Sequence, residues 1–293
     1  MTDDARARAL RLVAAPAWTS LSLLVACGGD GAGPDAPAKQ ETLTIAGSST
    51  LQPVAELAAE AFEVAHPGVR VEVQGGGSGV GVSATRSGLA QIGMVSRSLK
   101  PDEADLTATP VALDGIALIV HRDNPVAGLT KDQVFDVWSG AASSWAALGG
   151  ADRPITVVNK EEGRATLELF LHHFGLKDKV RADAVVIGPN GQAITTVAGN
   201  PDAVAYVSIG SATKAEQAGE AIRRVPLDGH EASVATVKDG SYPLSRELIF
   251  VTKGPPSGVA KDFVDFVRSP EGQAIAARED FIPVGEAGPV ASP

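Results

Sequence analysis

The feature that most constrains the fold is an alternation of short apolar segments with helical ones, which begins near Leu43 and continues almost to the end of the chain. β-branched runs such as "LTIAG" are followed by amphipathic stretches such as "PVAELAAEAFEVAHPG". This alternation is typical of α/β architecture, in which mainly parallel sheets carry helices on their faces. Hydrophobic residues make up 44% of the 293 residues. A core of that size needs no metal or disulfide to hold it together.

Two segments, "DGIALIVHRDNP" and "YPLSRELIFVTKG", divide the pattern into two units. A new α/β unit opens after the first segment, and the second leads back to the closing helix, so we interpret both as strands that cross between two lobes. Open α/β sheets bind ligands beyond the carboxyl ends of their strands, which favours a clamshell with one ligand cleft. The stretch "SGVAKDFVDFVRSPEGQAIAAR" is predicted as one amphipathic closing helix. The predicted bounds are 42–118 plus 247–286 for lobe I, 119–246 for lobe II and 287–293 for a tail.

The N-terminal segment carries arginines followed by a mostly apolar run that ends in "LVAC". This resembles a bacterial lipoprotein signal, so residues 1–26 are predicted to be removed and Cys27 to be lipidated. An ordinary secretory signal and a buried cysteine remain alternatives. The run is shorter than the ~20 apolar residues that a spanning helix needs. Residues 27–41 are predicted to be a flexible tether, which would place the protein in the periplasm or on the cell surface, anchored to a membrane by lipid.

The formal net charge of −10 limits the partners of this chain. An acidic surface argues against nucleic acid and does not attract anions at long range, so a bound anion must be held by local geometry. The five histidines show no metal-ligand spacing, and there is no GxSxG nucleophile motif. We therefore predict no catalytic residue, no metal and no cofactor.

Three hydroxyls, Ser48, Ser49 and Thr50, follow the first apolar segment and precede the first helix. A helix N-terminus leaves backbone N–H groups unpaired and carries the positive end of the helix dipole, so it can bind an anion without formal charge. One hydroxyl could serve simply as a helix cap. Three in succession exceed what capping needs, which favours a ligand-binding loop.

A second loop, "GGGSGVG", repeats this strand-loop-helix arrangement. Gly77 permits a close approach of the backbone, and Ser78 stands at the expected helix start. The Gly-Lys-Ser/Thr of a Walker loop is missing, and a GxGxxA match at 79–84 falls inside the expected helix rather than in the turn. A flexible surface loop is the alternative.

Two further positions are Ser96 with Arg97, which follow a buried-looking strand, and Asp114, at the start of the first crossing segment. Arginine can recognise an oxyanion with two parallel hydrogen bonds, although a surface salt bridge is the simpler explanation. Asp114 can accept a hydrogen bond from a protonated ligand and so reject an anion that has no proton to give.

The segment "NKEEGRAT" supplies Lys160, Arg164 and Thr166 at the start of another expected helix, where an anion again gains from the helix dipole. Glu161 and Glu162 also suit a helix start, so a solvated first turn is the alternative.

These segments, in this order, resemble the phosphate-binding proteins of bacterial high-affinity phosphate ABC importers. The likeness covers nearly all of 43–284 and includes "GSSTLQPV", "IGMVSR", "LDGIALIVHRDNPV", "VFDVWSG" and "FVDFVRSPEGQ". It implies a two-lobed periplasmic-binding-protein fold that closes on one phosphate and delivers it to a membrane permease, without enzymatic activity, as a monomer. Carried over to this sequence, the expected phosphate contacts are Ser48, Ser49, Thr50, Leu51, Gly77, Ser78, Ser96, Arg97, Asp114, Lys160, Gly163, Arg164 and Thr166.

The segment "KEEGRAT" departs from the family pattern Arg-Glu-x-Gly-Ser-Gly-Thr, because Lys160 replaces the arginine and Arg164-Ala165 replaces Ser-Gly. Lysine supplies a point charge instead of a planar fork, and Arg164 could restore the fork. A binding protein for sulfate, molybdate or another small oxyanion is therefore kept as the alternative, and a phosphate-handling enzyme as a more remote one.

Overall fold

The computed structural model describes residues 40–286, and the fold described below concerns these residues alone. The predicted signal segment, Cys27 and the predicted tail lie outside them, as does the predicted tether apart from its last two residues. Strand β1 (Glu41–Gly47) begins one residue before the expected start of lobe I. No helix within the described part of the chain is both long and apolar enough to cross a membrane.

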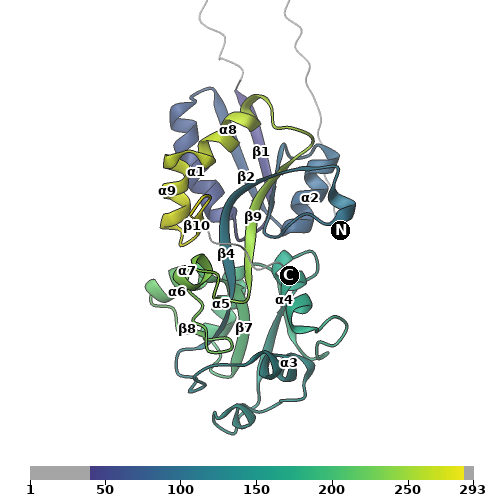
Figure 1. Ribbon diagram of the computed structural model, residues 1–293, viewed down its shortest axis with the longest axis vertical. Coiled ribbons are helices and arrows are strands. Elements are labelled where there is room, and N and C mark those ends of the chain that lie inside the picture. The colour runs from purple at the N-terminus through teal and green to yellow at the C-terminus, as the bar shows by residue number, and fades with distance from the viewer. Residues whose placement is uncertain (1–39, 287–293) are drawn as a thin grey trace, which may run out of the picture. The chain divides into compact units, whose positions relative to one another are not determined.

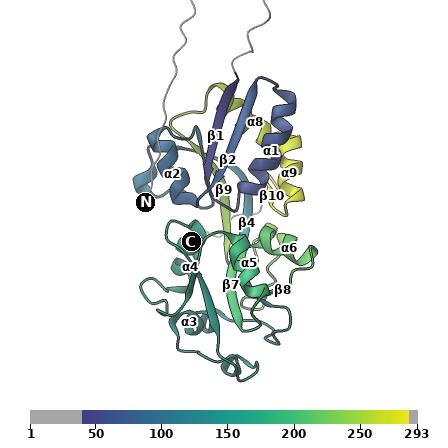
Figure 2. The same cartoon turned by 180° about the vertical axis from the view of Figure 1, so that it is seen from behind.

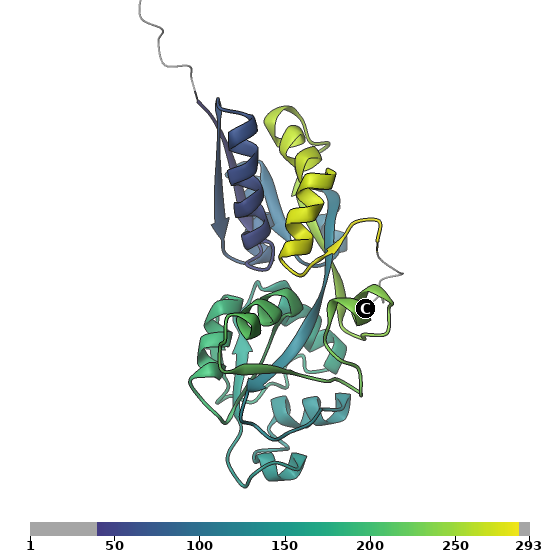
Figure 3. The same cartoon turned by 90° about the vertical axis from the view of Figure 1, so that its left-hand side faces the viewer.

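The sheet of lobe I has the strand order β2-β1-β3-β9-β4. β1 pairs in parallel with β2 and β3, whereas β9 is antiparallel to both β3 and β4. Helices α1, α8 and α9 share one apolar core with this sheet and stand side by side in Figure 3, whereas α2 packs on a separate small cluster. The bounds are β2 (Val69–Gly75), β3 (Ile92–Val95), β4 (Thr107–His121), β9 (Ser245–Thr252), α1 (Gln52–Ala65), α2 (Ser78–Ser87), α8 (Gly258–Arg268), α9 (Pro270–Arg278) and β10 (Ile282–Pro283).

Lobe II is built around the second half of β4, which pairs antiparallel with β7 and β8. β5 is parallel to both β6 and β7. Its core gathers large aromatic side chains, and the rings of Phe170 and Tyr206 stack with centroids 3.7 Å apart. The bounds are β5 (Thr156–Lys160), β6 (Val185–Ile187), β7 (Ala203–Ser208), β8 (Ile222–Val225), α3 (Lys131–Ser139), α4 (Ala165–Phe174), α5 (Asn190–Ala198), α6 (Ile209–Gln217) and α7 (Val234–Lys238).

β4 and β9 lie side by side and run from one lobe into the other (Figures 1 and 2). The main apolar core of lobe I includes Ala112 and Leu248, whereas that of lobe II includes Leu113 and Leu244. The passage between lobes therefore falls near Asp114, which stands opposite Arg246 in the register of the two strands. The prediction of an α/β fold with two lobes and two crossing strands is confirmed.

Three details of the predicted elements are wrong. The single closing helix is two helices, because Ser269 ends α8 and caps α9, and Pro270 has no N–H with which to continue a helix. The sequence "PDEADLTA", residues 101–108, has the polar composition of a helix start, but it forms only a 3-10 turn, Pro101–Glu103, before β4 starts at Thr107. The sheets are also less parallel than expected, since the two crossing strands pair antiparallel with their neighbours.

Candidate functional site

The loop after β1 brings its hydroxyls to a buried position at the lobe boundary. Gly47 has φ +134°, and an added Cβ there would lie 2.3 Å from the carbonyl oxygen of Met94, so only glycine fits this turn. Ser48 and Thr50 are buried, and the Ser48 hydroxyl accepts a hydrogen bond from the Thr50 N–H at 3.2 Å. Leu51, also buried, directly precedes α1. In the first turn of α1, the Gln52 N–H donates to the Ser48 carbonyl at 3.1 Å, the Ala55 N–H donates to the Leu51 carbonyl at 2.9 Å, and Pro53 has no N–H.

The glycine loop is fastened beside the first loop. The Gly77 N–H donates to the Gly47 carbonyl at 2.9 Å, and an added Cβ at Gly77 would lie 2.9 Å from the carbonyl oxygen of Gly163 in lobe II. Ser78 is the first residue of α2, and its hydroxyl accepts from the Ser96 N–H at 3.1 Å and lies 3.3 Å from the Ser96 hydroxyl. The structure thus brings the predicted serines of two loops together.

The centre of the cluster is an arginine that the sequence analysis missed. Arg246, on β9, is 2% exposed and contacts three predicted residues. Its Nη2 donates to Asp114 Oδ2 at 2.8 Å and to the Thr50 hydroxyl at 3.1 Å, and its Nη1 donates to the Thr166 hydroxyl at 2.8 Å. One guanidinium therefore joins lobe I, the crossing strands and the N-terminus of α4.

Asp114 has one oxygen engaged and one without a partner. Oδ2 accepts from Arg246 Nε and Nη2, whereas Oδ1 is buried and has no hydrogen-bond partner in the described chain. Burying such an acceptor without a partner costs free energy, so it marks a place where a donor is missing. A hydroxyl group on a ligand could supply that donor.

Lys160 and Arg164 add positive charge to the same region. Burial, together with the nearby charges of Arg164 and Arg246, lowers the pKa of Lys160 to about 7. Its Nζ lies 3.4 Å from the Gly188 carbonyl, a long contact for a hydrogen bond. Arg164 donates from Nε to Glu161 at 2.9 Å and reaches Ser49 from Nη1 at 3.4 Å. Gly163, at φ +80°, makes the turn that places Arg164 at the start of α4.

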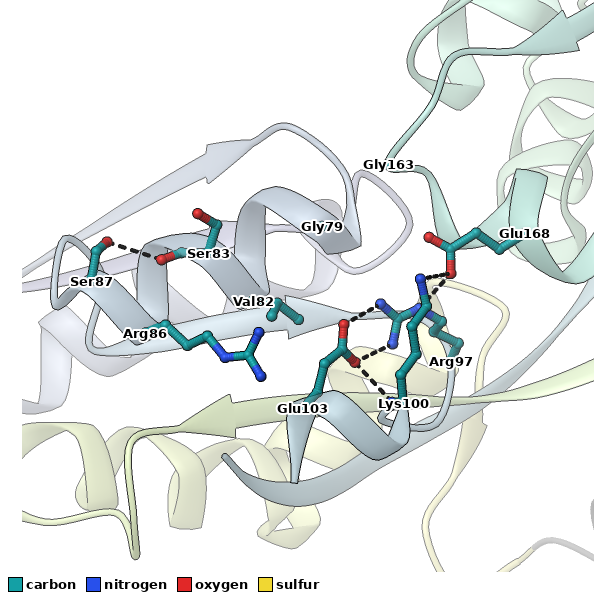
Figure 4. Close-up of a pocket in the computed structure, with 10 residues that line it drawn as sticks. All are labelled: Gly79, Val82, Ser83, Arg86, Ser87, Arg97, Lys100, Glu103, Gly163 and Glu168. Atoms are coloured by element: carbon teal, nitrogen blue, oxygen red, sulfur yellow. Dashed lines mark hydrogen bonds and ion pairs between the residues drawn. The ribbon is translucent and has the colours of Figure 1, made fainter. Parts of the chain in front are cut away.

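Arg97 is placed differently from the other predicted residues. Its side chain is engaged by two carboxylates, Glu103 at 2.7 Å and Glu168 at 2.9 Å, and lines an open pocket of about 640 Å³ together with Gly79 and Gly163 (Figure 4). No hydrogen bond of the described residues joins the Arg97 side chain to the cluster around Arg246. Its neighbour Ser96 does belong to the cluster, through Ser78.

Asn190 and Ser208 also escaped the sequence analysis. Asn190, the first residue of α5, is buried and donates from Nδ2 to Thr50 at 3.4 Å and to Ser211 at 3.1 Å. Ser208 ends β7 fully buried, and its hydroxyl has no hydrogen-bond partner within residues 40–286. The signal for Asn190 was the sequence "GPNG" between a strand and a helix, the same kind of junction as the loops that were identified.

The cluster as a whole can hold a small oxyanion. It offers buried hydroxyls, the first residues of helices α1, α2, α4 and α5, and three cationic side chains, against the buried carboxylate of Asp114 and the more exposed Glu161. Among residues 40–286, no group of three or more His, Cys, Asp and Glu side chains is arranged to bind a metal ion.

Comparison with known proteins gives one consistent result. A family model described as "PBP superfamily domain" matches residues 32–271. The chain is 30% identical to the phosphate-binding protein PstS of Bacillus subtilis, over 83% of this chain and 81% of that protein. It is 26% identical to the phosphate-binding protein PstS of Pseudomonas aeruginosa, over 83% of each chain.

Two solved structures share this fold at appreciable sequence identity. One is a substrate-binding protein with bound phosphate from Clostridium perfringens, with a TM-score of 0.78 and 36% identity over 83% of this chain and all of that one. The other is an ABC-type phosphate transport receptor from Vibrio cholerae, with a TM-score of 0.68 and 29% identity over 83% of this chain and all of that one.

Proposed function

Because this chain belongs to the PBP superfamily, we propose that it is an extracytoplasmic binding protein that captures inorganic phosphate between its lobes and delivers it to the permease of an ABC importer. Its relatives in Bacillus subtilis and Pseudomonas aeruginosa are named as phosphate-binding proteins, and the similar structure from Clostridium perfringens holds phosphate.

The observation that carries the proposal is the unpartnered, buried Oδ1 of Asp114 beside hydroxyl and guanidinium donors. Monobasic and dibasic phosphate each carry a proton that such an oxygen can accept in a hydrogen bond. Sulfate at neutral pH carries none, so the same oxygen would repel it. Asp114 therefore favours phosphate over the alternative oxyanions.

The remaining oxygens of phosphate are bound by hydroxyls, backbone N–H groups and cations. Arg246 supplies the fixed charge and, with Asp114, spans the boundary between the lobes. Lys160 and Arg164 approach from lobe II, and Arg97 supports the wall that contains Ser96. The proposed contacts are Ser48, Ser49, Thr50, Leu51, Gly77, Ser78, Ser96, Asp114, Lys160, Gly163, Arg164, Thr166 and Arg246, with Arg97 at the edge of the site.

The proposal extends to the oligomeric state, the membrane anchor, the location and the lobe bounds of the protein. The protein acts as a monomeric carrier rather than an enzyme, held to a membrane by a lipid on Cys27, in the periplasm or at the cell surface. Lobe I comprises 42–118 plus 247–286, and lobe II 119–246. The division of the two main apolar cores along β4 and β9 supports two lobes, although on β4 the core of lobe II already begins at Leu113, before the proposed boundary.

Titration calorimetry of the full chain with phosphate, sulfate and molybdate tests the proposal. We expect stoichiometric heat from phosphate and at least a tenfold weaker response to sulfate, about 1.4 kcal/mol in binding free energy. Tight sulfate binding with no heat from phosphate would overturn the assignment. Incubation with a chromogenic phosphate ester separates a carrier from an enzyme, since steady turnover would contradict a carrier.

A further inference from the structure

A second set of charges joins the two lobes beside the buried cluster. Glu168 lies on α4 of lobe II, and its Oε2 is 2.9 Å from Arg97 Nε and 2.9 Å from Lys100 Nζ, both in lobe I. Figure 4 shows the three side chains converging across the open pocket. Glu168 therefore forms ion pairs from lobe II with both of these cations of lobe I.

The lobe I side of this contact is held in place before Glu168 reaches it. Glu103 accepts two parallel hydrogen bonds from Arg97, from Nη1 at 2.7 Å and from Nη2 at 2.8 Å, and also accepts from the Lys100 N–H at 2.9 Å. Burial opposes the charge of Arg97, but Glu103 and Glu168 outweigh it and raise the pKa of the guanidinium. Arg97 is thus a fixed cation with its Nε directed at lobe II.

The contact is tied to the walls of the anion site on both sides. Arg97 directly follows Ser96, whose N–H donates to Ser78. On the other side, the Glu168 N–H donates to the Arg164 carbonyl at 3.2 Å in the first turn of α4, which also carries Thr166. Closing the lobes over an anion therefore brings Glu168 onto Arg97 in the same movement.

We propose that Glu168 is a positioning residue that latches the closed lobes and sets the release rate of the anion without touching it. The charges of Arg97, Lys100, Glu103 and Glu168 cancel within the group, so the latch needs no ligand to complete it. An anion that binds the closed form has an apparent affinity proportional to the closed fraction. The latch raises that fraction in the ligand-free protein.

The test compares Glu168→Gln with Glu162→Gln in the full chain. Glu162 stands in the loop before α4, is exposed and has no ion pair among the described residues, so its variant controls for loss of one negative charge from lobe II. This part of the test rests on the proposed function, because the ligand is inorganic phosphate. We expect Glu168→Gln to weaken phosphate binding by about 5- to 30-fold, mainly through faster dissociation, with the association rate changed less than threefold. Glu162→Gln is expected to stay within twofold of wild type.

Lys100→Gln provides a second variant, since the Lys100 side chain is half exposed and the change keeps the backbone N–H that donates to Glu103. It is expected to shift dissociation in the same direction by about two- to threefold, as partly exposed ion pairs contribute little. Equal dissociation rates for Glu168→Gln, Lys100→Gln and the control would overturn the proposal.

Small-angle scattering of ligand-free protein provides a readout that does not depend on the ligand. We expect ligand-free Glu168→Gln to have a larger radius of gyration than wild type and Glu162→Gln. Identical ligand-free scattering of all three proteins would count against the latch, even if none of them bound phosphate. If wild type bound no phosphate but Glu168→Gln was more extended, the proposed function would fail and the latch would stand.

Discussion

Two groups of charges lie at the boundary between the lobes, and they differ in how far the charges within each group balance. Around Arg246, an oxygen of Asp114 has no partner and cations outnumber buried carboxylates. Around Arg97, two cations meet two carboxylates and the charges balance, and Glu103 is held by both a guanidinium and a backbone N–H, although Arg97 Nε contacts Glu168 as an ion pair at 2.9 Å without a well-aligned hydrogen bond. An unsatisfied group can take up a ligand, whereas a satisfied one can only join two parts of the protein. Pairing, rather than the number of charges, separates a binding site from a structural contact.

The largest effect is expected from Arg246→Ala. The change leaves the buried Asp114 carboxylate without its partner, so we expect unfolding free energy to fall by about 3–5 kcal/mol and phosphate affinity to fall at least 100-fold. Denaturant unfolding and calorimetry measure the two effects. Arg70→Ala is the control, because Arg70 is exposed and its ion pair with Glu63 is 3.8 Å long. If Arg246→Ala changed stability and phosphate affinity no more than Arg70→Ala, the group around Arg246 would not be a binding site.

Asp114→Asn tests the unpartnered oxygen directly. The amide keeps the size of the side chain but can present an N–H where Oδ1 accepted, so the ligand proton loses its acceptor. We expect the preference for phosphate over sulfate to fall by about 10- to 100-fold, partly because sulfate is no longer repelled. Competition titrations with both anions measure the ratio. An unchanged ratio of phosphate to sulfate affinity would show that Oδ1 does not accept a hydrogen bond from the ligand proton.

Lys160 gives the first group a pH dependence that the second lacks. With a pKa of about 7 in the folded ligand-free protein, Lys160 is mostly charged below pH 7. A bound anion would raise that pKa, because a nearby negative charge favours the charged form of lysine. The ratio of the phosphate affinity of wild type to that of Lys160→Met should therefore be largest below pH 7. Above pH 7 this ratio should decrease, by at most about tenfold per pH unit. Calorimetry across pH 6 to 9 measures it, and a constant ratio would contradict the assignment.

The same lowered pKa predicts an effect on the stability of the ligand-free protein. Between about pH 7 and pH 10.5, Lys160 is more fully protonated in the unfolded chain than in the folded protein, because its pKa is about 7 when folded and ordinarily 10.5. Unfolding free energy therefore rises with pH through this window, relative to Lys160→Met, and the burial penalty is full below pH 7.

Much of the first group could be predicted from the sequence. Ser48, Thr50, Ser78 and Thr166 stand where strands meet helices, and such junctions converge at one edge of an α/β fold. The similarity of the ordered motifs to phosphate-binding proteins is confirmed by the relatives that match over most of the chain. Local sequence pattern and family resemblance could identify these residues because each motif is a continuous stretch of the sequence.

Arg246 could not be found in this way, because its role depends on the pairing of β4 with β9. Asp114 and Arg246 are 132 residues apart and meet only through that register. Each of the two apolar crossing segments contains a charged residue, Asp114 in the first and Arg246 in the second. The sequence analysis could have paired these two opposite charges but did not. For Arg97 the residue was identified, but its partners were not. Glu168 lies in the other lobe, and Glu103 reaches Arg97 only because the 3-10 turn Pro101–Glu103 brings it back toward that side chain.

The smallest effect is expected from Arg164, which lies between the two groups. It reaches Ser49 from one side chain nitrogen, but Glu161 takes up much of its charge. We therefore expect Arg164→Ala to weaken phosphate binding by only about three- to tenfold, in proportion to the charge that remains available. In Glu161→Gln the guanidinium is released, and affinity should rise by about two- to threefold. A double-mutant cycle of the two changes measures their coupling. If Arg164→Ala instead cost as much as Arg246→Ala, Arg164 would have restored the missing family arginine despite its carboxylate partner, and pairing would no longer distinguish the two groups.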